Sequence, residues 1–179
     1  MEFSIKSGAV ERLGGDITLV GIFQGMKLSP SASVLDKSLA GKIRKQAKIA
    51  GFDGRHGETL RILDTEGIST NQILLIGCGK AAELDIAAYR RVNSAAVRVI
   101  RSTVSTAVSC LSELKVTGID PSARTRHAVE AISAALYRFD AYKNKSAGKP
   151  NSLKKVVFAL DKKDATATKT AIRTGKAIA

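Results

Sequence analysis

Residues 71–80, Asn-Gln-Ile-Leu-Leu-Ile-Gly-Cys-Gly-Lys, are the feature that most constrains the fold of this chain. The four apolar residues at 73–76 predict a strand that is buried on both faces, since a strand with one solvated face alternates apolar and polar side chains. Gly77 and Gly79 predict a tight turn directly after this strand. Such a strand needs cover on both sides, so the rest of the chain is expected to supply helices above and below a sheet.

Apolar runs alternate with amphipathic segments along the chain. Further strands are predicted at residues 2–6, 16–23, 59–63, 104–111 and 156–160. Helices are predicted at 33–50 with a break at Gly41, at 85–101, from 120 onwards and from 164 to 179, with Asp85 and Asp120 as N-caps. Residues 59–63 and 73–76 are close enough in sequence to form a hairpin. The pattern predicts an α/β three-layer sandwich with a mixed central sheet.

The chain has the size and composition of a single domain. Its 179 residues are 44% hydrophobic and only 4% aromatic, without tryptophan, so one core of Val, Ile, Leu and Ala is expected. The two cysteines, Cys78 and Cys110, lie in apolar runs, which predicts buried thiols and no disulfide framework. An apolar targeting segment and a membrane-length apolar run are both missing from the sequence, so a cytoplasmic protein is expected.

The charge balance is strongly basic. Lys and Arg number 29 against 16 Asp and Glu, a net charge of +13. Residues 42–48 form the most concentrated positive segment, and 143–155 a second one. Such a surface attracts polyanions, so it indicates either a nucleic acid or acidic partner or simply a well-solvated basic face.

The turn at residues 77–82 satisfies the pattern G-x-G-x-x-A after a strand. Glycines there let backbone N–H groups approach a phosphate, which makes Gly77, Gly79 and Lys80 candidates for a nucleotide-binding turn. Two observations oppose this interpretation. The next helix is expected to begin only near Asp85, and residues 97–101 lack the acidic residue that such sites carry about twenty positions on. The alternative is a tight turn between a strand and a helix.

No catalytic or metal site is predicted from the residues themselves. The histidines at 56 and 127 and the two cysteines are far apart and show no ligand spacing such as C-x-x-C or H-x-x-x-H. A G-x-S-x-G nucleophile elbow does not occur in the sequence.

Four segments, at residues 28–30, 57–59, 73–80 and 137–140, carry a family resemblance. Their order and intervals closely resemble the N-terminal domain of bacterial leucyl aminopeptidases, also called cytosol aminopeptidase or aminopeptidase A, from about Phe3 to Ala179. The resemblance implies a macro-domain-like fold, with residues 1–162 as a non-catalytic α/β domain. It also implies that residues 163–179 begin the linker helix to a C-terminal catalytic domain that is missing from this sequence.

The resemblance implies a function for the longer protein. In that family the C-terminal domain holds two divalent metal ions, Mn²⁺ or Zn²⁺, and removes N-terminal amino acids from peptides. Its ligands and catalytic residues lie around an Asn-Thr-Asp-Ala-Glu-Gly-Arg motif, which nothing in this sequence matches. We therefore expect this chain alone to be inactive, and to serve assembly into a homo-hexamer and access to the active site.

Two other roles remain open. Some bacterial members of the family bind DNA, and the charge of the chain agrees with such a role. The candidate phosphate contacts are Lys42, Arg44, Lys45, Lys48, Lys143, Lys145 and Lys149. Macro-like binding of a nucleotide or ADP-ribose at the turn of residues 77–80 is the other alternative.

Overall fold

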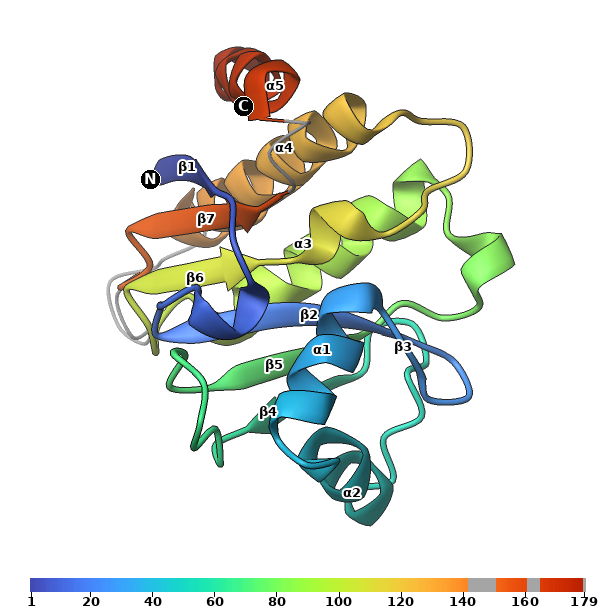
Figure 1. Ribbon diagram of the computed structural model, residues 1–179. Coiled ribbons are helices and arrows are strands. Elements are labelled where there is room, and N and C mark those ends of the chain that lie inside the picture. Colours follow the sequence, from blue (N-terminus) through green and yellow to red (C-terminus); the bar gives the residue numbers. More distant parts are fainter. Residues whose placement is uncertain (142–150, 161–164, 179) are drawn as a thin grey trace.

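A seven-stranded mixed sheet lies between two layers of helices in the computed structural model, which describes residues 1–141, 151–160 and 165–178 (Figure 1). The strands are β1 (Glu2–Lys6), β2 (Ile17–Phe23), β3 (Lys27–Leu28), β4 (Thr59–Ile62), β5 (Ile73–Gly77), β6 (Thr106–Ser109) and β7 (Lys155–Ala159). The helices are α1 (Pro30–Ser38), α2 (Lys42–Ile49), α3 (Ile86–Ile100), α4 (Pro121–Ala141) and α5 (Ala165–Ile178). Three short 3-10 turns are η1 (Val10–Arg12), η2 (Ala81–Glu83) and η3 (Leu111–Glu113).

The strand order in the sheet is β1-β7-β6-β2-β5-β4, with β3 paired to β2 outside this path. All neighbours from β1 to β5 are parallel, whereas β4 runs antiparallel to β5 and β3 antiparallel to β2. The predicted hairpin is confirmed, since Thr59 lies opposite Ile76 and Ile62 opposite Ile73. The mixed sheet is confirmed as well, and residues 2–6 form its edge strand β1.

Strand β5 is buried along its whole length, as its apolar run predicted. Its side chains alternate between the two faces of the sheet. Leu74 and Ile76 belong to the core under α3 and α4, whereas Ile73 and Leu75 belong to the core under α1 and α2. The neighbouring strand β2 has the same character, so the two central strands carry both cores.

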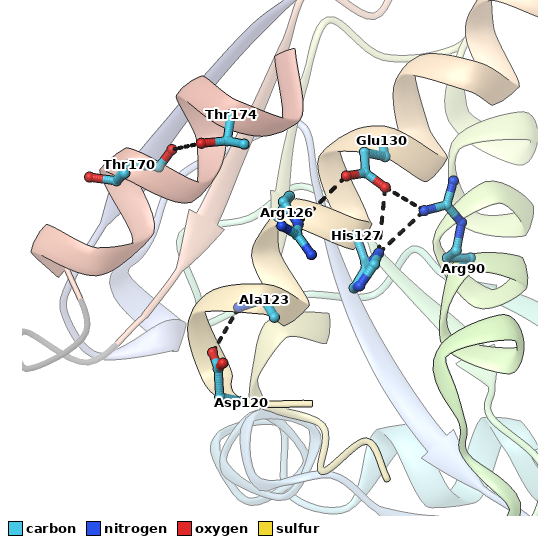
Figure 2. Close-up of polar contacts among 8 residues, drawn as sticks. All are labelled: Arg90, Asp120, Ala123, Arg126, His127, Glu130, Thr170 and Thr174. Carbon is cyan, nitrogen blue, oxygen red and sulfur yellow. Dashed lines mark hydrogen bonds and ion pairs between the residues drawn. The ribbon is translucent and has the colours of Figure 1, made fainter. Parts of the chain in front are cut away.

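Two helical layers cover the sheet. Helices α1 and α2 lie on one face, and α3 and α4 lie on the other, with α5 packed beside α4 and β1 (Figure 1). The predicted N-caps are confirmed. An Asp85 oxygen accepts from the backbone N–H of Ala88 at 2.7 Å. An Asp120 oxygen accepts from the backbone N–H of Ala123 at 2.9 Å, as Figure 2 shows. In the described part of the chain, no helix has the length and apolar character required to cross a membrane.

The structure corrects some predicted boundaries. Helix α1 begins at Pro30 rather than at residue 33, because Ser29 caps it by accepting from the N–H of Ala32 at 3.4 Å. Strand β6 is shorter than the predicted 104–111, since residues 111–113 turn away from the sheet as η3. The two-residue strand β3 and the 3-10 turns were not predicted, because such short elements have no hydrophobic period. The break at Gly41 is confirmed, with φ at +80°.

The turn after β5 packs against the backbone of the loop formed by residues 53–58. Gly77 accepts from the N–H of Gly57 at 3.1 Å and donates to the carbonyl of Glu58 at 2.8 Å, and Gly79 donates to Gly54 at 3.0 Å. A Cβ at Gly77 would lie only 1.9 Å from the carbonyl oxygen of Arg55. Glycine at position 77 is therefore required by this backbone-to-backbone contact.

Replacing that glycine should be costly. We expect Gly77→Ala to lower the free energy of unfolding by about 2–3 kcal/mol, because the methyl group meets backbone atoms that cannot rotate away. Urea denaturation followed by circular dichroism measures the change. The matched control is Gly14→Ala, where the nearest atom to a new Cβ is 3.7 Å away and the effect should stay within about 0.5 kcal/mol. Equal stability of the two variants would contradict the packing described for the turn.

Stability should also fall at high pH. Burial raises the pKa of Cys78, Cys110 and Tyr89 to about 12, whereas the ordinary values are 9.0 for a thiol and 10.0 for tyrosine. The unfolded chain therefore loses these protons first, and stability that is present below pH 9 is lost as the pH rises towards 12, by at most about 1.4 kcal/mol per pH unit for each group. Urea titrations across this range should show the decline, and Tyr89→Phe should make it shallower above pH 10. An identical pH profile for that variant would contradict the burial of the tyrosine hydroxyl.

Candidate functional site

The topology of the sheet places a natural binding position between β2 and β6. The chain leaves β2 through α1 towards the β4 and β5 side, and leaves β6 through α4 towards β7 on the other side. Ligands of open α/β sheets bind outside the carboxyl ends of strands at such a switch point. A cavity of about 650 Å³ lies there, bounded by residues that follow β1, β2, β6 and β7.

The lining of this cavity mixes apolar and charged groups. Its charged residues are Glu11 in η1, Glu113 in η3 and Arg124 in the first turns of α4. Hydroxyl groups come from Ser31 and Ser112. The remaining lining residues are Gly8, Ala9, Val10, Pro30, Val34, Ala159 and Leu160. We call this space the carboxyl-edge cavity.

Glu113 caps the N-terminus of α1 from a different part of the chain. Its carboxylate accepts from the Ser31 hydroxyl at 2.6 Å and from the Ser31 backbone N–H at 3.0 and 3.2 Å. A negative charge at this end compensates the helix dipole of α1. The same contact occupies donors that would otherwise attract an anion, so the N-terminus of α1 is closed to phosphate while Glu113 stays in place.

Arg124 is held on the opposite side of the cavity. One terminal nitrogen of its guanidinium donates to the backbone carbonyl of Leu114, which fixes the first turns of α4 against the segment after η3. The side chain is half-buried. Its Nε has no hydrogen-bond partner among the residues that the structure describes.

A second polar centre joins α3 to α4. Glu130 lies between three basic side chains: Arg90 at 2.5 Å, the His127 Nδ1 at 3.4 Å and Arg126 at 3.7 Å (Figure 2). The Glu130 side chain is only 13% exposed, so its charge requires these partners. Arg90 also borders a cavity of about 470 Å³ between the two helices, together with Arg91, Arg98 and several alanines. The ion pairs of Glu130 therefore hold α3 to α4.

The predicted basic residues lie partly on one helix. On α2, Lys42 pairs with Asp64 at 2.8 Å and lowers the pKa of that carboxyl, and Arg44 pairs with Asp36 at 3.2 Å. Lys45 and Lys48 are exposed and have no ion-pair partner within the described ranges. The other three candidates, Lys143, Lys145 and Lys149, lie outside the described residues.

The predicted nucleotide turn contacts protein backbone. Gly77 and Gly79 face the loop at residues 53–58, and the Lys80 ammonium pairs with Glu83 at 3.0 Å on the surface. Helix α3 begins only at Ile86, several residues after the glycine turn. The N-terminus of the helix therefore does not follow the glycines directly. The residues of the carboxyl-edge cavity were not singled out from the sequence, because their convergence depends on the strand order.

The described residues do not supply a metal centre. No group of three or more His, Cys, Asp or Glu side chains is placed to hold an ion within ranges 1–141, 151–160 and 165–178. The ring of His56 lies 3.3 Å from the carbonyl of Ala88, and His127 belongs to the Glu130 cluster. The two metal ions that the family resemblance implies therefore have no ligand set in this part of the chain.

Comparison with known proteins agrees with the family resemblance. Residues 19–146 match the family model described as "Cytosol aminopeptidase family, N-terminal domain". A probable cytosol aminopeptidase of Methylobacillus flagellatus is 35% identical over 181 residues, an alignment that covers all of this chain and 36% of the relative. The chain thus spans about a third of the length of that relative.

Solved structures share the fold at low sequence identity. A tomato leucine aminopeptidase mutant aligns with a TM-score of 0.68 at 17% identity, over 99% of this chain and 36% of its own. A Trypanosoma brucei macrodomain in complex with ADP aligns with a TM-score of 0.67 at 10% identity, over 96% of this chain and 69% of its own. These likenesses confirm the macro-domain-like α/β sandwich. By its family match and its full-length alignment, the chain belongs to the cytosol aminopeptidase family and corresponds to the N-terminal domain of that family.

Proposed function

We propose that the chain is the accessory N-terminal domain of a two-metal leucyl aminopeptidase that removes N-terminal amino acids from peptides. The observation that carries the proposal is the alignment of the entire chain with 36% of a probable cytosol aminopeptidase, within the region that the family model calls N-terminal. On this proposal, peptide hydrolysis and the two ions, Mn²⁺ or Zn²⁺, belong to the remaining two thirds of the longer protein. The protein works in the cytoplasm.

The accessory role is assembly and access. We propose residues 1–162 as the non-catalytic domain and 163–179 as the start of the linker to the catalytic domain. Helix α5 packs against that domain: Ile172 is buried and Gly175 lies directly against Val129 of α4. A rigidly seated helix would hold the following domain at a defined angle. In the longer protein, we propose a homo-hexamer whose N-terminal domains shape the route to the active site.

Activity assays with leucine p-nitroanilide test the catalytic part of this proposal. With Mn²⁺ or Zn²⁺ present, the 179-residue chain should release no p-nitroaniline above buffer, whereas the longer product of the same gene should hydrolyse the substrate. Hydrolysis by the 179-residue chain would overturn the accessory assignment.

For the assembly role, the longer product is compared with a version lacking residues 1–162, after circular dichroism has shown that the shortened form is folded. We expect a smaller oligomer by light scattering and a changed preference for peptide length; an unchanged oligomer and preference would contradict the role in assembly and access.

Binding of DNA is a second candidate, and the exposed lysines of α2 favour it. Lys45 and Lys48 lie on the solvent side of the helix, and the structure gives neither an acidic partner among the described residues. Lys42 and Arg44 already neutralise carboxylates, so Lys45 and Lys48 are the members of that cluster best able to contact phosphates. We place any nucleic-acid contact on this face of α2.

A salt titration of duplex binding tests that candidate. Removal of two phosphate contacts in Lys45→Ala/Lys48→Ala should weaken binding and reduce the slope of log K against log salt by about 2. The matched control is Lys27→Ala/Lys115→Ala, which removes the same charge from exposed positions outside α2. Fluorescence anisotropy with a labelled duplex gives both slopes. Equal losses in the two double variants, or no binding at low salt, would remove α2 as a DNA contact.

A further inference from the structure

We propose that the carboxyl-edge cavity binds a small apolar zwitterion, such as an apolar amino acid or a short apolar peptide, and that Glu11 and Arg124 hold its two charged ends. The inference does not rest on the aminopeptidase proposal, because it concerns binding by this chain alone. It rests on the position of the cavity, the sign of its charge and the distribution of its charged groups between two helical layers.

Among the described residues, the lining of the cavity is more acidic than the protein as a whole. The chain carries +13 overall, yet the lining residues that the structure describes include two carboxylates, one cationic side chain and no lysine. A phosphate ligand is disfavoured, since the Glu113 carboxylate already accepts from the backbone N–H and the hydroxyl of Ser31 at the N-terminus of α1. An ammonium group is favoured instead, because the carboxylates of the lining attract a cation that the rest of this basic protein repels.

Glu11 is the carboxylate available to a ligand. It lies in η1 and is half-buried, and its side chain makes no hydrogen bond or ion pair with any residue in the described ranges. Both carboxylate oxygens of Glu113, by contrast, already accept hydrogen bonds from Ser31. A half-buried carboxylate without a partner is unfavourable, and a ligand ammonium would supply the missing charge-assisted hydrogen bonds.

Arg124 supplies the complementary charge from another element. Its bond to Leu114 uses only one of the five N–H donors of the guanidinium, and this anchoring fixes the side chain before a ligand arrives. A planar guanidinium with free donors matches a carboxylate. Glu11 belongs to η1, which packs on α1, whereas Arg124 belongs to α4 on the other face of the sheet. The two charges therefore approach the cavity from different helical layers.

Apolar side chains provide the remaining contacts of the ligand. Val10, Pro30, Val34 and Leu160 line the cavity, and Val34 is 42% exposed there. An apolar ligand would bury this surface. The volume of about 650 Å³ lies within the range of small-molecule sites, roughly 300–1,000 Å³.

Titration of the 15N-labelled 179-residue chain with L-leucine tests the inference, with two isosteres as probes of the two ends. The isostere 3-methylbutylamine lacks the carboxylate, and 4-methylpentanoate lacks the ammonium. We expect saturable shifts at millimolar leucine that centre on residues 8–11, 30–34 and 112–114, and at least about tenfold weaker binding of either isostere, because each loses one charge-assisted contact.

Variants separate the proposed contacts from general effects. Glu11→Gln should weaken leucine binding at least about tenfold, while Glu66→Gln, an exposed glutamate in the turn before β5, should not change it. Val34→Phe narrows the cavity from an exposed position and should abolish the shifts without unfolding the domain.

Three outcomes would overturn the proposal. The first is an absence of saturable shifts with leucine. The second is equal binding of leucine and of both isosteres, which would mean that the charged ends are not recognised. The third is tighter binding of ADP than of leucine in the same cavity, which would assign it to phosphate ligands. Because none of these measurements uses peptide hydrolysis, they stand or fall separately from the aminopeptidase proposal.

Discussion

The burial of β2 and β5 on both faces is the constraint on which the rest of the structure depends. These strands lie side by side in parallel register, and their alternate side chains enter two separate cores. Neither core can exist without helices on its own side of the sheet, so the helices are divided between two layers. The packing around these strands is close at Gly21 in β2, where a Cβ would lie 2.9 Å from the Cys78 sulfur and 3.0 Å from Leu114. The central strands thus determine both the layers and how closely the turns at their ends approach.

Local sequence patterns were sufficient to predict the helices and strands, but they did not predict the candidate site. The apolar run of β5, the caps at Asp85 and Asp120 and the break at Gly41 act through neighbours in sequence, so they could be predicted. The carboxyl-edge cavity combines residues 8–11, 30–34, 112–124 and 159–160, which only the strand order brings together. Glu113 shows the difficulty well: it caps a helix 82 residues earlier in the chain, and no spacing rule connects the two positions.

The distribution of charge separates three surfaces of the domain. On α2, Lys45 and Lys48 face solvent and have no ion-pair partner among the described residues, whereas Glu130 lies mostly buried between α3 and α4, where its ion pairs hold the two helices together. The carboxyl-edge cavity is different from both, because its acidic groups lie within an otherwise basic molecule. A net charge of +13 therefore describes only the average, and the local arrangement decides which ligand chemistry each surface favours.

The contact between Gly77 and residues 53–58 limits which sequence changes the domain can accept. Because a backbone oxygen fills the place of a side chain at position 77, the loop and the turn can change only together. In a chimera of two relatives, residues 53–58 and 77–79 would need to come from the same parent, even though strand β4 separates them in sequence. The two segments therefore have to be exchanged together.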